Sequence, residues 1–283
     1  MKKNQFGLRK GYNGVTKKTN SIKKVTSKKI KAEYKKHANL KNVLQSIYHD
    51  HVNLETTCNH NLCCCETAMP MLSSSEFTQV ITDLWKDLDA EGKITIICKS
   101  IEYFFKYDYE KWGKDTLLKP CMFLNKGKKI CDIYENRPLN CRLYGLWPSD
   151  SYNKRVDRFE KVYSQYGLKR EELPLNTQCP HVKRKDDSKP ITEEVIEGLF
   201  NKLNDIDKKS DSFTNLQIEQ KENYRTFHDW LLLKIYGEDW LSKLTAFIMA
   251  ADKETMQDQL EQIIKAMKES FLKNGVPDVI RGF

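Results

Sequence analysis

The sequence predicts an α+β fold that is mostly α-helical, with an irregular cysteine-rich centre and a small β-hairpin flanked by helices. Three observations lead to this prediction. Apolar residues recur at helical spacing in several long segments. Two short runs of apolar and aromatic residues are typical of strands. Eight of the nine cysteines share one repeated pattern, and most of them lie where no regular periodicity is visible.

The composition is that of a folded protein whose positive charge is confined to one end. Hydrophobic residues make up 39% of the 283 residues, which is enough to form a core. Residues 1–50 hold 14 Lys and Arg against 2 acidic residues, so the whole net charge of +9 comes from this end. We interpret residues 1–37 as a basic, disordered arm. Such an arm binds nucleic acid or an acidic protein, or it is a solubilising tail.

The sequence also indicates the cellular compartment of the protein. It has no run of about 18 apolar residues, so it predicts no membrane span. The lysine-rich N-terminus lacks the apolar segment of a secretory signal peptide. We therefore expect a cytoplasmic protein in a reducing compartment, where disulfides are rare.

Two helices are expected ahead of the main cysteine segment. The first is a short one from Ala38 to Ile47. The second begins at a capping box, in which a serine of Ser73-Ser-Ser-Glu76 accepts a backbone N–H and the glutamate reaches back. We expect Glu91-Gly92 to end this helix. Its buried face is predicted from helical spacing. The residues of that face are Phe77, Val80, Ile81, Leu84, Trp85 and Leu88.

Two strands are expected next, paired as a hairpin. They are Ile94–Ile97, which is apolar, and Ile101–Tyr107, which is rich in aromatic residues. Cys98 lies at the end of the first run. As a lone cysteine in an apolar stretch, it is interpreted as a core residue and not as a metal ligand.

Beyond residue 150 the chain is predicted to be strongly helical. Apolar stripes span residues 191–203, 224–247 and 256–271, and the polar run 207–216 is expected to be a loop. We assign residues 38–185 to a cysteine-cluster domain and residues 186–283 to a helical C-terminal region that packs on it.

The remaining eight cysteines are spaced as in a metal site. Four thiolates hold one tetrahedral zinc ion or one iron–sulfur cluster, so eight thiolates leave room for two metals or a larger cluster. A single structural zinc ion is the alternative. Adjacent side chains point apart, so the sequence leaves open which two of the triplet at 63–65 bind. The predicted ligands are Cys58, Cys63, Cys64, Cys65, Cys121, Cys131, Cys141 and Cys179.

Other side chains are expected around the metal. Arg137 and Arg142 are placed to offset the negative charge of the thiolates through N–H···S contacts, and Tyr134 is expected to pack over the loop. His60 and His181 each lie beside a cysteine and are possible ligands, although such histidines are more often surface residues. Pro138 is expected to open a short helix that carries Cys141.

These motifs resemble the YkgJ-like family of zinc- or iron-chelating cysteine-cluster proteins. The resemblance covers roughly residues 58–181. It depends on the cysteine blocks, on Leu72-Ser73 with Glu76, on Cys121-Met-Phe-Leu124, and on Cys131-Asp-Ile-Tyr-Glu-Asn-Arg137-Pro138-Leu-Asn-Cys141-Arg142. The resemblance implies metal binding by these cysteines. Asn61 stands where many members have a further cysteine.

Three functions from different classes are compatible with this sequence. The favoured one is a zinc, iron or iron–sulfur protein with a redox or protein-modifying role, such as an iron–sulfur oxidoreductase. The second is an enzyme like the flagellin lysine-N-methylase proteins, to which the chain is weakly similar; the absence of G-x-G-x-x-G and G-x-x-x-x-G-K-[ST] loops counts against it. The third is a nucleic-acid-associated protein with a structural zinc ion and the basic arm as its anchor. The sequence indicates no catalytic residue.

Overall fold

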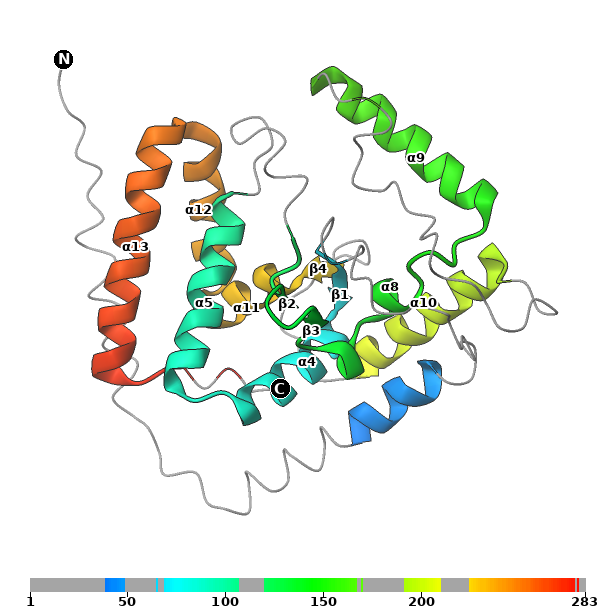
Figure 1. Ribbon diagram of the computed structural model, residues 1–283, viewed down its shortest axis with the longest axis horizontal. Coiled ribbons are helices and arrows are strands. Elements are labelled where there is room, and N and C mark those ends of the chain that lie inside the picture. The colour runs from blue at the N-terminus through cyan, green and yellow to red at the C-terminus, as the bar shows by residue number, and fades with distance from the viewer. Residues whose placement is uncertain are drawn as a thin grey trace.

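The computed structural model describes residues 39–48, 65, 69–106, 120–166, 169, 191–209, 224–277 and 279. Within these ranges helices dominate, and the strands form two small antiparallel sheets (Figure 1). The predicted α+β, mostly α-helical class is therefore confirmed. The arm of residues 1–37 lies outside the described residues, so its binding to nucleic acid or to an acidic protein stays a prediction. No helix in the described ranges is both long and apolar enough to cross a membrane.

The first helices form largely as the sequence predicts. A helix covers residues 39–48, and strand β1 (Met71–Ser73) leads directly into helix α4 (Ser74–Asp87). The capping box is present: Glu76 donates its N–H to the Ser73 hydroxyl at 3.3 Å, and the Glu76 carboxylate accepts the Ser73 N–H at 3.0 Å. Helix α4 ends earlier than expected because Asp89 caps a new helix by accepting the N–H of Gly92 at 2.8 Å.

The prediction of two strands, at Ile94–Ile97 and Ile101–Tyr107, is wrong. Residues 90–105 form one helix, α5 (Ala90–Phe105). Its buried residues recur three and four positions apart, so the helical periodicity outweighs the β-branched and aromatic composition of the two runs. The buried residues of α5 are Ile94, Ile97, Cys98, Ser100, Ile101 and Phe105. Cys98 is thus a core residue, as predicted.

The hairpin, which the sequence analysis places between the two cysteine blocks, lies within the second block instead. Strands β2 (Leu124–Asn125) and β3 (Ile130–Cys131) pair antiparallel, with Leu124 opposite Cys131. A 3₁₀ helix η2 (Tyr134–Asn136) follows, and then the short helix α8 (Leu139–Arg142), which starts after Pro138 as expected.

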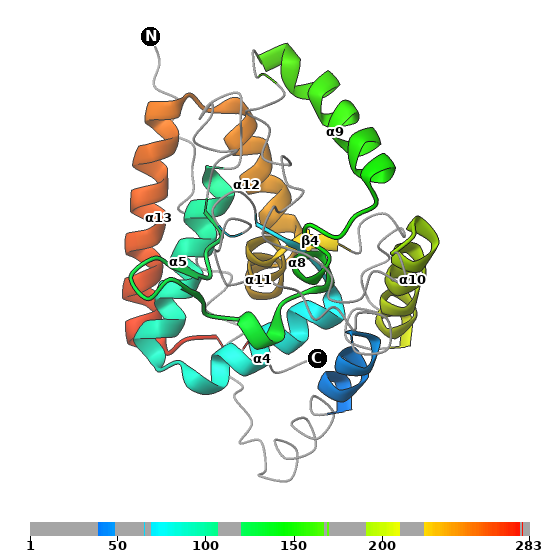
Figure 2. The same ribbon diagram turned by 45° about the vertical axis from the view of Figure 1, so that its right-hand side comes forward.

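The second half of the described chain is helical apart from one short strand. Helices α9 (Ser149–Tyr163), η3 (Ser164–Tyr166) and α10 (Glu193–Lys209) precede strand β4 (Tyr224–Thr226). Helices α11 (Phe227–Tyr236), α12 (Glu238–Ala250) and α13 (Lys253–Asn274) follow it. The first three residues of the run 207–216 belong to α10, and the rest lie outside the described residues. Figure 2 shows α9 at the periphery of the molecule, apart from α12 and α13.

Strand β4 joins the C-terminal helices to the first half of the chain. It pairs antiparallel with β1, with Met71 opposite Thr226 and Ser73 opposite Tyr224. Each of these strands runs straight into a helix with its own capping box, Ser73 with Glu76 for α4 and Thr226 with Asp229 for α11. The pairing therefore places the first turns of α4 and α11 at opposite ends of one small sheet.

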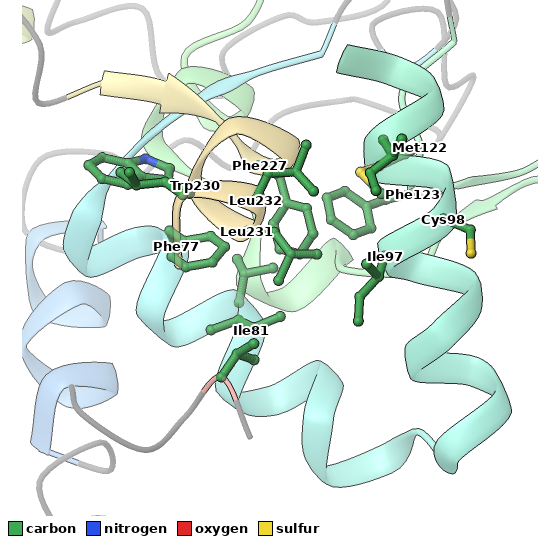
Figure 3. Packing of buried hydrophobic residues seen from close by; sticks show 14 of the residues in the cluster. Phe77, Ile81, Ile97, Cys98, Met122, Phe123, Phe227, Trp230, Leu231 and Leu232 are labelled. Atoms are coloured by element: carbon green, nitrogen blue, oxygen red, sulfur yellow. The ribbon is translucent and has the colours of Figure 1, made fainter. Parts of the chain in front are cut away.

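The buried apolar residues form two cores. The larger one joins α4, α5, α11, α12, α13 and the β2–β3 hairpin. At its centre the ring centroid of Phe227 lies 5.3 Å from that of Phe77 and 4.8 Å from that of Phe123 (Figure 3). Full burial of a side chain of this size contributes about 1.5–3 kcal/mol to the stability of the fold. The smaller core joins the helix over residues 39–48 with α8 and α10.

Helix α4 lies between the two cores and turns a polar side toward the smaller one. Lys41 forms an ion pair of 3.0 Å with Asp83, and the side-chain amide of Gln79 donates to the same carboxylate at 2.9 Å. At the start of α4, the N–H of Ser75 donates to Asp207 of α10 at 2.9 Å. The two cores are thus joined by hydrogen bonds and an ion pair as well as by apolar packing.

Candidate metal centre

Four of the eight predicted ligands lie in the described part of the chain. Cys65, Cys121 and Cys131 are buried within the larger core, and Cys141 is half-buried. The N–H of Cys121 donates to the carbonyl of Cys65 at 2.5 Å. The fold therefore brings Cys65, the last cysteine of the first block, to the start of the second block. Cys58, Cys63, Cys64 and Cys179 lie outside the described residues, as do His60 and His181.

The hairpin determines where Cys121 and Cys131 lie. The N–H of Leu124 donates to the Cys121 carbonyl at 3.0 Å, which turns the chain into β2, and Leu124 pairs with Cys131 across the hairpin. The N–H of Asp132 then donates to the Phe123 carbonyl at 2.9 Å. Cys121 and Cys131 are therefore held on one small, hydrogen-bonded unit.

Two side chains outside the cysteine motifs contact the chain at Cys121. The hydroxyl of Tyr103, on α5, donates to the carbonyl of Pro120 at 2.6 Å. Burial and then the neighbouring Cys121 raise the pKa of Tyr103 to about 12, so this phenol remains a hydrogen-bond donor at neutral pH. The thioether sulfur of Met69 lies 3.8 Å from the sulfur of Cys121.

Cys141 depends on a buried carboxylate for its position. Glu76 is 1% exposed, and its carboxylate accepts the N–H of Leu139 at 2.6 Å and the hydroxyl of Tyr48 at 2.8 Å. Leu139 is the first residue of α8, so Glu76 satisfies an N–H that has no partner within the helix. Burial raises the pKa of Glu76. The capping box of α4 thus also anchors the helix that carries Cys141.

The two arginines of the second block hold the loop between Cys131 and Cys141. Arg142 donates from Nε to the Arg137 carbonyl and from Nη2 to the Glu135 carbonyl, both at 2.8 Å. Arg137 donates to the Tyr134 carbonyl at 3.0 Å and lies 3.6 Å from the centroid of the Tyr134 ring. The guanidinium of Arg142 also lies 4.3 Å from the centroid of the Tyr48 ring. The N–H···S contacts expected of these arginines stay a prediction.

Sequence reasoning missed three side chains around this centre, namely Tyr48, Tyr103 and His228. His228 is 1% exposed and its ring centroid lies 6.0 Å from that of Tyr103. None of the three lies next to a cysteine in the sequence. Tyr103 belonged to an aromatic run that we interpreted as a strand, and His228 to an apolar stripe.

The donor set suits zinc or iron. Buried thiols beside a hydrogen-bonded hairpin are soft ligands, which both metals accept as thiolates. Within the described ranges no three of the His, Cys, Asp and Glu side chains gather closely enough to hold a metal ion. A complete site therefore needs the cysteines outside those ranges.

Residues 56–179 match the family model CxxCxxCC, described as a putative zinc- or iron-chelating domain. The matched segment includes every cysteine that the sequence predicts as a ligand, and the match supports zinc or iron as the bound metal. No curated protein and no solved structure matches the chain.

The matched segment shares its core with helices that lie outside it. The indole N–H of Trp230, on α11, donates to the carbonyl of Leu72 at 2.9 Å and is buried. Helix α11 packs along α5, and β4 pairs with β1. The C-terminal helices thus form one side of the interior of the matched segment. The division into domains at residues 185 and 186 stays a prediction.

Proposed function

We propose that this protein binds zinc or iron through the thiolates of its two cysteine blocks and Cys179, and that the metal links the first block to the second. The observation that carries this proposal is the hydrogen bond between the Cys121 N–H and the Cys65 carbonyl. It brings together two cysteines that lie far apart in the sequence, one from each block. The family match over residues 56–179 supports the same metals.

The ligands that we propose are Cys58, two of the three cysteines at 63–65, Cys121, Cys131, Cys141 and Cys179. These seven thiolates fit two zinc ions that share one bridging thiolate, or an iron–sulfur cluster held by four of them with a further metal on the other three. Bound zinc would supply a structural link or a Lewis acid, and an iron–sulfur cluster would supply one-electron transfer.

Residues around the proposed site hold the main chain that carries the cysteines. Glu76 and Arg142 anchor α8 and its preceding loop, and Tyr103 holds the main chain before Cys121. Each uses hydrogen bonds to the backbone, and these bonds support the proposal because they hold the main chain next to Cys121 and Cys141. The binding energy of a structural metal, on the order of 10 kcal/mol, is at the same time folding energy. Metal binding therefore also stabilises the segment from Cys121 to Cys141.

The proposal is tested by elemental analysis and visible absorption of the full chain, purified without oxygen. We expect zinc or iron in the wild type, with loss of metal in Cys131→Ser and in Cys141→Ser. Cys98→Ser is the matched control because Cys98 is also buried but lies in the core of α5, and it should keep the wild-type metal content. A metal-free wild type would contradict the proposal, and unchanged stoichiometry in both serine variants would contradict the ligand set.

The same spectrum separates the two forms of the proposal. Iron together with acid-labile sulfide and a broad visible charge-transfer band would identify an iron–sulfur cluster, and with it a redox role. Zinc without visible absorption would identify a structural or Lewis-acid site.

A further inference from the structure

The turn of the β2–β3 hairpin carries three lysines within four residues. Residues 126–129 join the two strands and have the sequence Lys-Gly-Lys-Lys; we call them the basic turn. All four residues are exposed. In Figure 2 this turn extends across α5. The three ammonium groups are therefore available to a partner in solution.

The charge of the basic turn is not balanced by neighbouring carboxylates. Lys126, Lys128 and Lys129 form no ion pair with any carboxylate in the described part of the chain. Residues 120–134 contain these three lysines and one acidic residue, Asp132. Residues 51–283 as a whole hold 34 Lys and Arg against 37 acidic residues, so the turn is a positive site on a slightly negative part of the chain. Concentrated positive charge of this kind attracts an anionic partner.

The hairpin holds the three lysines on a defined loop. Asn125 pairs with Ile130 across the strands, and Oδ1 of Asn125 accepts the N–H of Lys128 at 3.1 Å. Lys129 has a φ of +53°, in the left-handed region that favours glycine or asparagine. The backbone of the turn would be more stable with one of those residues at this position, so what lysine adds there is its charge.

The residue types of the basic turn favour nucleic acid as the anionic partner. The ammonium group of lysine binds phosphate oxygens as a point charge, and such contacts give affinity without reading the base sequence. Protein interfaces are enriched in aromatic residues and arginine and depleted in lysine, and the turn has neither an aromatic residue nor an arginine. Anionic lipid surfaces are bound by clusters of about four to eight basic residues or by a large apolar face. Three lysines beside Ile130, which is 45% exposed, supply less of both.

We propose that the basic turn binds the phosphate backbone of nucleic acid through Lys126, Lys128 and Lys129. This inference does not rest on the proposed metal-binding function, and its site is separate from the N-terminal arm. Each lysine that contacts a phosphate of duplex DNA releases about one counterion, so the affinity falls steeply as the salt concentration rises. Three such contacts contribute about 2.7 to the slope of the logarithm of affinity against the logarithm of salt concentration.

The test measures binding of the full chain to a short fluorescent DNA duplex between about 50 and 200 mM salt. The first variant combines Lys126→Gln, Lys128→Gln and Lys129→Gln. We expect its affinity at the lowest salt concentration to be about tenfold or more weaker than that of the wild type, and its salt slope to be smaller by about 2.7.

The matched control removes the same charge from exposed positions on α12 and α13. It combines Lys243→Gln, Lys265→Gln and Lys273→Gln, and it should keep the wild-type salt slope. Equal losses of affinity in the two triple variants would show that only the net charge of the protein matters, and would overturn the inference.

A single substitution, Lys129→Asn, separates the charge of the turn from its shape. Asparagine tolerates the left-handed backbone, so this variant should unfold at the same temperature as the wild type or higher, while its salt slope falls by about 0.9. A weaker affinity in this variant therefore does not come from a misfolded hairpin.

Three further results would overturn the inference. The first is a wild type that does not bind the duplex at the lowest salt concentration. The second is a basic-turn triple variant with the wild-type slope, because other basic residues then bind the DNA. The third is a triple variant that binds DNA as the wild type does but no longer binds vesicles containing phosphatidylserine, because the turn then contacts lipid.

Discussion

The hydroxyl of Tyr48 donates a hydrogen bond of 2.8 Å to the carboxylate of Glu76, and both groups are buried. This bond connects the helix over residues 39–48 to the start of α4. Because the same carboxylate atom accepts the N–H of Leu139, the bond also reaches the helix that carries Cys141. Three segments that are distant in the sequence thus meet at one buried acidic group beside the candidate metal centre.

Removing the Tyr48 hydroxyl should destabilise the fold. In Tyr48→Phe the ring remains to pack against Arg142, but Glu76 loses one of its donors while staying buried. A buried charged acceptor that loses a donor costs about 1–3 kcal/mol, so we expect the free energy of unfolding to fall by that amount. Urea unfolding measures it.

Ser46→Ala is the matched control for this experiment. It removes a hydroxyl from the same helix, but that hydroxyl is exposed and bonds only to the nearby Val43 carbonyl. We expect a change within about 0.5 kcal/mol. Equal effects of the two substitutions would show that Tyr48 contributes no more than a surface hydroxyl does.

The carboxyl of Asp207 should make the stability of the fold depend on pH. Asp207 accepts the N–H of Ser75 at 2.9 Å and the hydroxyl of Ser73 at 3.4 Å, and burial raises its pKa from the ordinary 3.8. The folded protein then holds this proton more tightly than the unfolded chain. The contribution of Asp207 to stability is therefore fully present below pH 3.8 and is lost as the pH rises through the raised pKa.

Asp207→Asn isolates this contribution, because an asparagine oxygen can accept the same two bonds. We expect the unfolding free energy of the wild type, minus that of Asp207→Asn, to decrease with rising pH above the unfolded pKa. The slope for one proton is at most about 1.4 kcal/mol per pH unit. Urea titrations of both proteins at a series of acidic pH values give the difference. A constant difference would mean that the pKa of Asp207 is the same in the folded and unfolded states.

Gly237 should tolerate no side chain although there is space for one. It separates α11 from α12 with φ +83° and ψ 168°, and nothing lies within 4 Å of the position that a Cβ would take. This region of backbone conformation is essentially restricted to glycine, so Gly237→Ala should lower the free energy of unfolding by about 1–3 kcal/mol.

Gly198→Ala is expected to have the opposite effect on stability. Gly198 lies inside α10, a Cβ there also meets nothing within 4 Å, and its backbone is helical. Alanine in a helix is more favourable than glycine by about 0.8–1 kcal/mol, so this variant should be more stable than the wild type. Thermal unfolding of both variants measures the two predicted changes in stability. Stabilisation by both substitutions would contradict the backbone argument at Gly237.

Local patterns in the sequence correctly predicted local structure. The capping box of Ser73 and Glu76, the short helix after Pro138 and the core position of Cys98 each depend on a few neighbouring residues. The spacing of the cysteines likewise predicted the class of metal that the family match supports. In each case the chemistry lies within one motif, so no knowledge of the fold is needed.

The hairpin shows where local information fails. The runs at Ile94–Ile97 and Ile101–Tyr107 are rich in residues that favour strands, but each is too short to show its period. Together their apolar residues fit one helical face, and packing of that face against α11 and α13 selects the helix. The hairpin forms at Leu124 and Cys131, where the strands are only two residues long and carry no visible alternation.

The sequence by itself thus determined most of the helices, the capping box of α4 and the thiols that are available to a metal. Only the tertiary structure decided which groups surround those thiols. The bonds from Tyr48 to Glu76 and from Tyr103 to Pro120, and the position of His228 beside Tyr103, join residues that no local repeat connects. They arise because burying the apolar faces of α4, α5 and α11 in one core forces the polar groups at the edges of those faces to satisfy one another.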